Sequence, residues 1–102
     1  MRSPLLAFSL FVLSGLAPAH AADAIVAIKN FDFAMDVTVT PGSTVTWRNL
    51  YGVSHTVVST DGLFRSPALD QNDTFSFKFD HPGVYKYLCS IHPRMRAIVT
   101  VK

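Results

Sequence analysis

Apolar and polar residues alternate with a period of two along most of the chain after residue 21, which is the pattern of half-buried β-strands. Proline–glycine or aspartate–glycine pairs at 41–42, 61–62 and 82–83 separate several of these runs and indicate turns. No run has a convincing helical period, and residues 63–73 are expected to form a loop or one short helical turn. The runs that we expect to form strands are 25–29, 35–39, 44–49, 55–59, 74–79, 84–88 and 97–101.

About seven short strands at this regular spacing predict an all-β fold in which two sheets pack as a sandwich. The core is expected to come from large apolar residues on one face of each strand. Phe75, Phe77 and Phe79 share such a face, while Ser76 and Lys78 occupy the other. The remaining core candidates are Trp47, Tyr85, Tyr87 and Met35, whereas His81 is expected to be a solvated turn residue.

The first 21 residues have the features of a secretory signal peptide. Arg2 gives a positive start, residues 5–16 carry no charge, and Ala19-His20-Ala21 is a small-x-small cleavage signal. The uncharged run is shorter than the roughly 20 residues that span a bilayer, so no membrane anchor is expected. We therefore expect a signal peptide over 1–21, followed by a single domain over 22–102 that is exported to the periplasm as a soluble protein.

Composition narrows the possible functions. A chain of 102 residues has room for one domain, and a net charge of +2 does not suggest a nucleic-acid partner. One cysteine can form neither an internal disulfide nor a four-thiolate metal site. The sequence contains no glutamate, no paired carboxylates in a glycosidase-like context and no glycine-rich phosphate loop, so we do not expect an enzyme.

The chemistry is concentrated in one segment, in which Cys89, His92 and Met95 have the spacing C-x2-H-x2-M directly after a predicted strand. His55 begins another predicted strand, and if the two strands are neighbours, one end of the sandwich collects a thiolate, two imidazoles and a thioether. This donor set is that of blue-copper electron-transfer sites, whereas zinc sites rarely use methionine. Three tight ligands and one weak one leave no position for a substrate, which favours electron transfer over catalysis.

The same residues resemble the cupredoxins, the small blue copper proteins. The resemblance extends from Pro41-Gly42 and the run 44–47 to the run 82–87 before Cys89. Proline directly after His92, together with the C-x2-H-x2-M spacing, is most similar to the amicyanin branch, whereas plastocyanin and pseudoazurin have a longer histidine-to-methionine gap.

This resemblance implies a Greek-key sandwich of seven to eight strands with one type 1 copper ion at one end. It implies His55, Cys89 and His92 as equatorial ligands and Met95 as the axial ligand. The exposed edge of His92 would be the electron port. The implied partners are transient redox proteins, a dehydrogenase as donor and a cytochrome c as acceptor, and the protein itself is expected to be a monomer.

Two positions depart from the family pattern. Many cupredoxins have asparagine after the first ligand histidine, where it ties the two ligand loops together, but this chain has Thr56. Its single hydroxyl has fewer hydrogen bonds to offer, so we expect either pairing with Ser90 or a weaker link. Arg94 replaces an apolar residue before Met95, and with Arg96 and Arg48 it would place positive charge near the port.

Around His92, an apolar patch and ordinary loop burial are equally good interpretations of five residues: Leu50, Tyr51, Val53, Ile91 and Pro93. Two alternative functions also remain open from the sequence. One is a periplasmic copper-binding protein or metallochaperone without a redox cycle, and the other is a metal-free sandwich used for binding.

Overall fold

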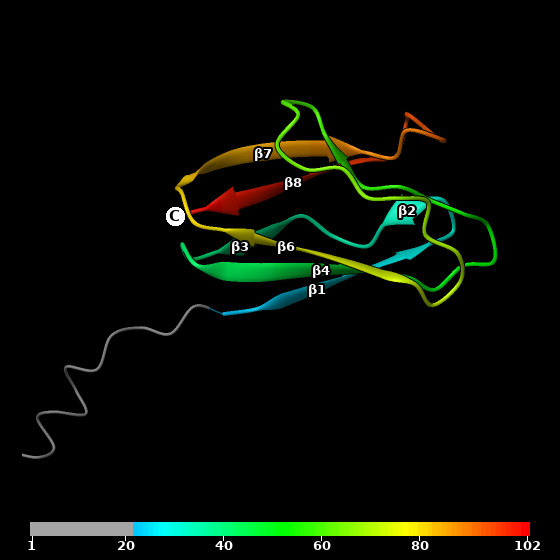
Figure 1. Ribbon diagram of the computed structural model, residues 1–102, viewed down its shortest axis with the longest axis horizontal. Helices are drawn as coiled ribbons and strands as arrows, with labels where there is room; N and C mark the ends of the chain where they lie inside the picture. The colour runs from blue at the N-terminus through cyan, green and yellow to red at the C-terminus, as the bar shows by residue number, and fades with distance from the viewer. Residues whose placement is uncertain (1–21) are drawn as a thin grey trace, which may run out of the picture.

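The computed structural model describes residues 22–102, and the expected signal peptide over 1–21 lies outside the described residues. The described chain is all β, with eight strands and no helix (Figure 1). It therefore contains no helix long and apolar enough to cross a membrane. The strands are β1 (Ala24–Lys29), β2 (Asp32–Phe33), β3 (Val37–Val39), β4 (Ser43–Asn49), β5 (Val58–Ser59), β6 (Thr74–Phe79), β7 (Gly83–Leu88) and β8 (Arg96–Val101).

The strands form two four-stranded sheets that face each other, in the orders β2-β1-β4-β6 and β3-β8-β7-β5. The β1–β4 and β3–β8 pairs are parallel, and the other pairs are antiparallel. Figure 1 shows the two layers with the chain crossing repeatedly between them. The predicted all-β sandwich is confirmed.

Aromatic rings from both sheets fill the space between the layers. Trp47 on β4 is fully buried and contacts Tyr87 on β7 edge to face, with ring centroids 5.2 Å apart. Phe64, from the loop after β5, packs 5.6 Å from Trp47 and 5.7 Å from Phe79. The expected core residues Trp47, Phe79 and Tyr87 are buried, and Phe75, Phe77 and Tyr85 are partly buried against them.

Met35 was expected in the core, and this prediction is wrong because its side chain is 56% exposed. Strand β3 begins only at Val37, so the alternating pattern starts two residues later than the sequence suggested. The inward position before it belongs instead to Phe33 on the short strand β2, whose ring lies 4.7 Å from that of Tyr87.

The run 55–59 forms less strand than expected. Only Val58–Ser59 pairs with β7, while His55 makes an isolated bridge with Leu69. Residues 63–73 form an irregular loop with no helical turn, and within this loop the side chain of Leu69 is buried. This loop supplies backbone partners to the segment that carries His55, so it supports the site although it forms no regular element.

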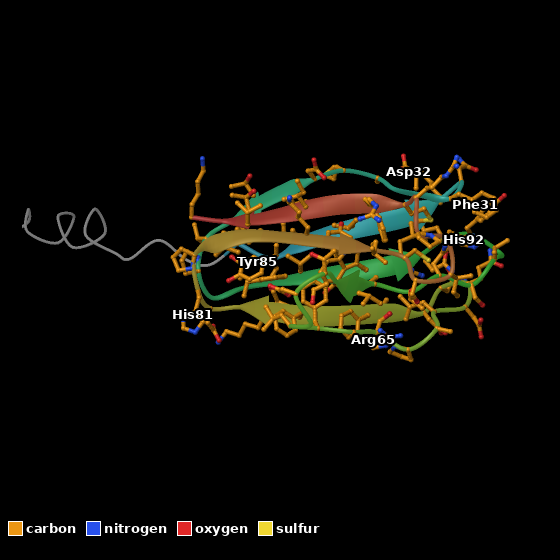
Figure 2. The ribbon with its side chains drawn as sticks, turned by 90° about the horizontal axis from the view of Figure 1, so that it is seen from above. Phe31, Asp32, Arg65, His81, Tyr85 and His92 are labelled. Carbon is orange, nitrogen blue, oxygen red and sulfur yellow. The ribbon has the colours of Figure 1, made fainter. Side chains whose placement is uncertain are left out.

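The two ends of the sandwich differ in character. Phe31 in the β1–β2 turn and His92 in the β7–β8 loop lie at one end, whereas His81 in the β6–β7 turn lies at the other (Figure 2). His81 is exposed, as expected for a turn residue. Phe31 and His92, which are far apart in the sequence, therefore lie at the same end of the molecule.

Candidate metal centre

His55 is held in the interior by its backbone rather than by a strand. Its N–H donates to the Leu69 carbonyl at 3.1 Å, and its own carbonyl accepts from the Leu69 N–H at 2.7 Å. The side chain is fully buried. Burial, together with the nearby charge of His92, lowers the pKa of His55 below its usual value. Both effects favour the neutral imidazole, which is the form that binds metals.

Asn49, at the end of β4, anchors the same loop, and the sequence analysis did not identify it. Its Nδ2 donates to the carbonyls of Val53 at 2.9 Å and Leu69 at 2.8 Å, and its Oδ1 accepts from the Tyr51 N–H at 2.9 Å. The residue is fully buried. A buried asparagine so fully bonded fixes the loop that ends at His55. The only sequence signal was a polar residue at an inward-facing position of a strand.

Cys89 follows β7 directly, is fully buried and forms no disulfide. Its Sγ lies 3.7 Å from His55 Nδ1. First-row metal bonds of roughly 2.3 Å to thiolate and 2.0–2.1 Å to imidazole, opened at trigonal or tetrahedral angles, would place the two atoms about 3.5–3.8 Å apart. The observed separation fits two ligands of one metal ion. The predicted convergence of residue 55 on residue 89 is thus found in the structure.

Thr56 connects the loop of His55 to the loop of Cys89. The Ser90 N–H donates to Thr56 Oγ1 at 2.7 Å, and the two side-chain hydroxyls lie 2.8 Å apart. The Thr56 N–H approaches Cys89 Sγ at 3.3 Å, and Thr56 Oγ1 lies 3.7 Å from the same sulfur. If Ser90 donates both bonds to Oγ1, the Thr56 hydroxyl proton is free to point at sulfur. Thr56 therefore links the two loops and also contacts the sulfur.

The loop from Cys89 to Met95 closes on itself. The Cys89 N–H donates to the Met95 carbonyl at 3.1 Å, and the Met95 N–H donates to the His92 carbonyl at 2.9 Å. Met95 is buried, and β8 begins at the next residue. Because Leu88 pairs with Arg96, the strands hold both ends of the loop in register. Cysteine, histidine and methionine are therefore presented from a single hairpin loop.

His92 is the least constrained of the four predicted ligands. It is half-buried, and its ring centroid lies 5.1 Å from that of His55. The Nε2 atoms of both histidines are buried without a hydrogen-bond partner among residues 22–102. Within that range, no three His, Cys, Asp or Glu side chains lie together closely enough to hold a metal ion. The structure therefore brings His55 and Cys89 to ligand spacing and places His92 beside them, on the solvent side.

The surface around His92 is apolar. Leu50, Val53 and Ile91 are 42%, 39% and 48% exposed, and Pro93 is exposed beside them. Of the two interpretations of these residues, the exposed patch therefore fits better than complete burial, although Tyr51 is half-buried. Phe31 lines the same surface, and no pattern in the sequence pointed to it.

The three arginines discussed for this end are all exposed: Arg48, Arg94 and Arg96. Arg48 lies 3.5 Å from Asn72 Oδ1, and Arg94 lines the same surface hollow as His92. The only ion pair among residues 22–102 is Lys78–Asp80, on exposed side chains of β6 and the turn after it. None of the three arginines is therefore neutralised by a carboxylate within the described chain.

A two-sheet sandwich with a buried Cys–His pair at one end is the arrangement of a metal-binding domain. Comparison with known families shows which metal it binds. Residues 22–102 match the model of copper-binding proteins of the plastocyanin/azurin family, and the chain belongs to this family. Copper is therefore the metal that this domain binds, and the resemblance to the cupredoxins is confirmed.

Amicyanins are among its relatives. The chain is 35% identical to amicyanin-alpha of Methylorubrum extorquens over 91 residues, covering 84% of this chain and 76% of that protein. It is 32% identical to amicyanin of Paracoccus versutus over 72 residues, covering 66% of this chain and 54% of that protein.

Solved structures agree with this assignment. A purple cupredoxin from Nitrosopumilus maritimus superposes with a TM-score of 0.73 at 36% identity, covering 78% of this chain and all of that one (100%). An oxidized methionine-to-leucine mutant of amicyanin superposes with a TM-score of 0.72 at 27% identity, covering 78% of this chain and 81% of that one.

Proposed function

We propose that this protein is a blue copper electron carrier in which His55, Cys89, His92 and Met95 bind one copper ion. The 3.7 Å separation of Cys89 Sγ and His55 Nδ1, in a chain of a copper-binding family, is the observation that most supports the assignment. When bound, copper supplies reversible one-electron chemistry.

The protein residues hold and insulate that chemistry. Cys89 would bind the metal as a thiolate, and the backbone N–H of Thr56 lies 3.3 Å from its sulfur. His55 is fixed from behind by Leu69 and Asn49, so it would move little between oxidation states. Met95 is buried at the base of the loop, and its thioether would be a weak ligand of the copper ion. Because these donors leave no position for a substrate, the protein carries electrons rather than catalysing a reaction.

His92 is the proposed exit for the electron because it is the only one of the four ligands that reaches solvent. Phe31, Ile91 and Pro93 line the same surface hollow as His92, and such an apolar surface suits brief docking. The partners are larger redox proteins, with a dehydrogenase as donor and a cytochrome c as acceptor. Residues 1–21 are proposed to be a signal peptide that directs residues 22–102 to the periplasm as a soluble monomer.

Adding Cu(II) to the apo-protein tests this function. An intense visible band from thiolate-to-copper charge transfer is expected, together with reversible voltammetry. Cys89→Ser should abolish the band, whereas Ser76→Ala, a change at an exposed serine on β6, should retain it. A colourless complex would refute the assignment. Rapid loss of copper to a chelator in either oxidation state would instead favour a metallochaperone.

A further inference from the structure

The turn between β1 and β2 has a conformation that its sequence does not favour. Lys29 pairs with Asp32 across a two-residue turn, in which Asn30 and Phe31 have φ values of 55° and 59°. Turns with two positive φ angles strongly prefer Asn-Gly, because a side chain in this region clashes with the following carbonyl. Asparagine is common at such a position, but phenylalanine is not. The residue that the geometry favours at position 31 is glycine.

The strained backbone delivers the Phe31 ring to the proposed copper site. The ring contacts His92 edge to face with centroids 5.0 Å apart, and it contacts His55 in the same manner at 5.8 Å. It also packs against Tyr51 at 5.3 Å. Figure 2 shows Phe31 and His92 together at this end of the sandwich. A side chain that is 47% exposed nevertheless touches both histidines.

His92 needs such a contact because little else fixes its ring. Neither His92 Nε2 nor His55 Nε2 has a hydrogen-bond partner among residues 22–102, but the His55 ring is fully buried whereas the His92 ring is only half-buried. The ring also borders an open hollow of about 450 Å³. The hollow is lined by Phe31, Ile91, His92, Pro93, Arg94 and Met95. Without the Phe31 ring, the imidazole would face this space with much less lateral contact.

We propose that Phe31 is a positioning residue for the copper site, whose ring holds the His92 imidazole against His55 and covers the solvent side of the pair. The unfavourable backbone conformation at position 31 persists because it places the ring there. This inference rests on the proposed function, since it takes His92 as a ligand. It predicts that replacing Phe31 by glycine relieves the backbone strain and, at the same time, loosens the copper site.

Phe31→Gly should move the stability of the apo-protein and the retention of copper in opposite directions. Glycine suits the turn, so the apo-protein should unfold at the same midpoint as the wild type or higher, while the copper site loses its ring contact. Release of copper from the reduced, copper-loaded protein to bathocuproine disulfonate should become about two- to tenfold faster, the range expected for losing an aromatic pair. In NMR spectra of the Cu(I) form, the His92 ring resonances should broaden.

Two further variants serve as controls. Asn30→Gly relieves strain at the preceding residue but keeps the ring, so its copper release and His92 resonances should match the wild type. Phe31→Tyr keeps an aromatic ring and should do the same. Equal release from Phe31→Gly and the wild type would overturn the inference, and so would accelerated release from Asn30→Gly. A wild-type protein without the charge-transfer band would instead disprove the proposed function itself.

Discussion

Ser90 donates its backbone N–H to the hydroxyl oxygen of Thr56 at 2.7 Å, and this bond ties the two loops that carry the proposed ligands. In many cupredoxins an asparagine provides this connection. Here Thr56 provides it with a smaller side chain, and the Ser90 hydroxyl, 2.8 Å from Thr56 Oγ1, adds a second contact. The sequence left open whether Thr56 would pair with Ser90 or leave the link weak. The structure shows the pairing.

Thr56→Val tests this link. Valine has the same shape but no hydrogen-bonding group, so the Ser90 N–H loses its acceptor and Cys89 Sγ loses a donor. The apo-protein should lose about 1 kcal/mol of unfolding free energy, measured by urea denaturation. Thr38→Val, at an exposed threonine on β3, is the matched control and should change stability by less than about 0.5 kcal/mol. Equal effects of the two substitutions would show that the link contributes nothing.

Asn49→Asp should damage the scaffold behind His55. The Nδ2 group donates two hydrogen bonds to carbonyl oxygens, and a carboxylate would place negative charge against both of them. Because Asn49 is fully buried, we expect a loss of about 3 kcal/mol or more in unfolding free energy. Asn72→Asp, on the exposed loop before β6, is the control. A stable Asn49→Asp protein with an unchanged visible spectrum would contradict this role of Asn49.

Met95→Gln should keep copper but lower the reduction potential, because an oxygen donor favours Cu(II) over Cu(I). Voltammetry measures the shift directly. Met35→Gln is a useful comparison, since that methionine is largely exposed. An unchanged potential in the Met95 variant would mean that this thioether is not the axial ligand.

Tyr87 should make the fold sensitive to alkali. Burial raises its pKa to about 12, and the negative charge of Asp36 makes a smaller contribution in the same direction. Below pH 10 the phenol is protonated in both the folded and the unfolded chain, so its contribution to stability is complete. As the pH rises from 10 towards 12, only the unfolded chain releases the proton, and stability falls.

Tyr87→Phe removes that alkaline loss. The Tyr87 hydroxyl and Trp47 Nε1 are both buried without a hydrogen-bond partner among residues 22–102, since the two groups do not meet in hydrogen-bonding geometry. The variant should therefore be as stable as the wild type near pH 8, and more stable near pH 11, in denaturant titrations of the apo-protein. A loss of more than about 1 kcal/mol near pH 8 would show that the two groups are bonded in solution.

Local sequence determines much of this fold and part of the site. Cys89, His92 and Met95 could be identified together because they lie in one hairpin loop whose ends are fixed by neighbouring strands. The Phe75, Phe77 and Phe79 stripe could be assigned because strand alternation is a local property. Met35 failed the same reasoning, since alternation alone does not show where a strand begins.

The remaining features depend on contacts between distant segments. Phe31 meets His92 only because β1 and β2 bring their turn to the same end as the β7–β8 loop. Asn49 and Leu69 support His55 together although they lie 20 residues apart in the sequence. Phe64 fills the core from a loop that has no regular pattern. Neither the alternation of apolar and polar residues nor the spacing of the motifs predicts these long-range contacts.

His55 is fully buried and its backbone is bonded twice to Leu69, whereas His92 is half-buried, has one backbone bond from Met95, and has its ring against that of Phe31. Ring contacts tolerate sliding, whereas a doubly bonded backbone does not. Warming or mild cosolvents should therefore disorder the centre asymmetrically, with the outer imidazole gaining freedom while the inner one keeps its place. The copper centre would become disordered first at His92, on the solvent side, and then at His55, before the sandwich itself unfolds.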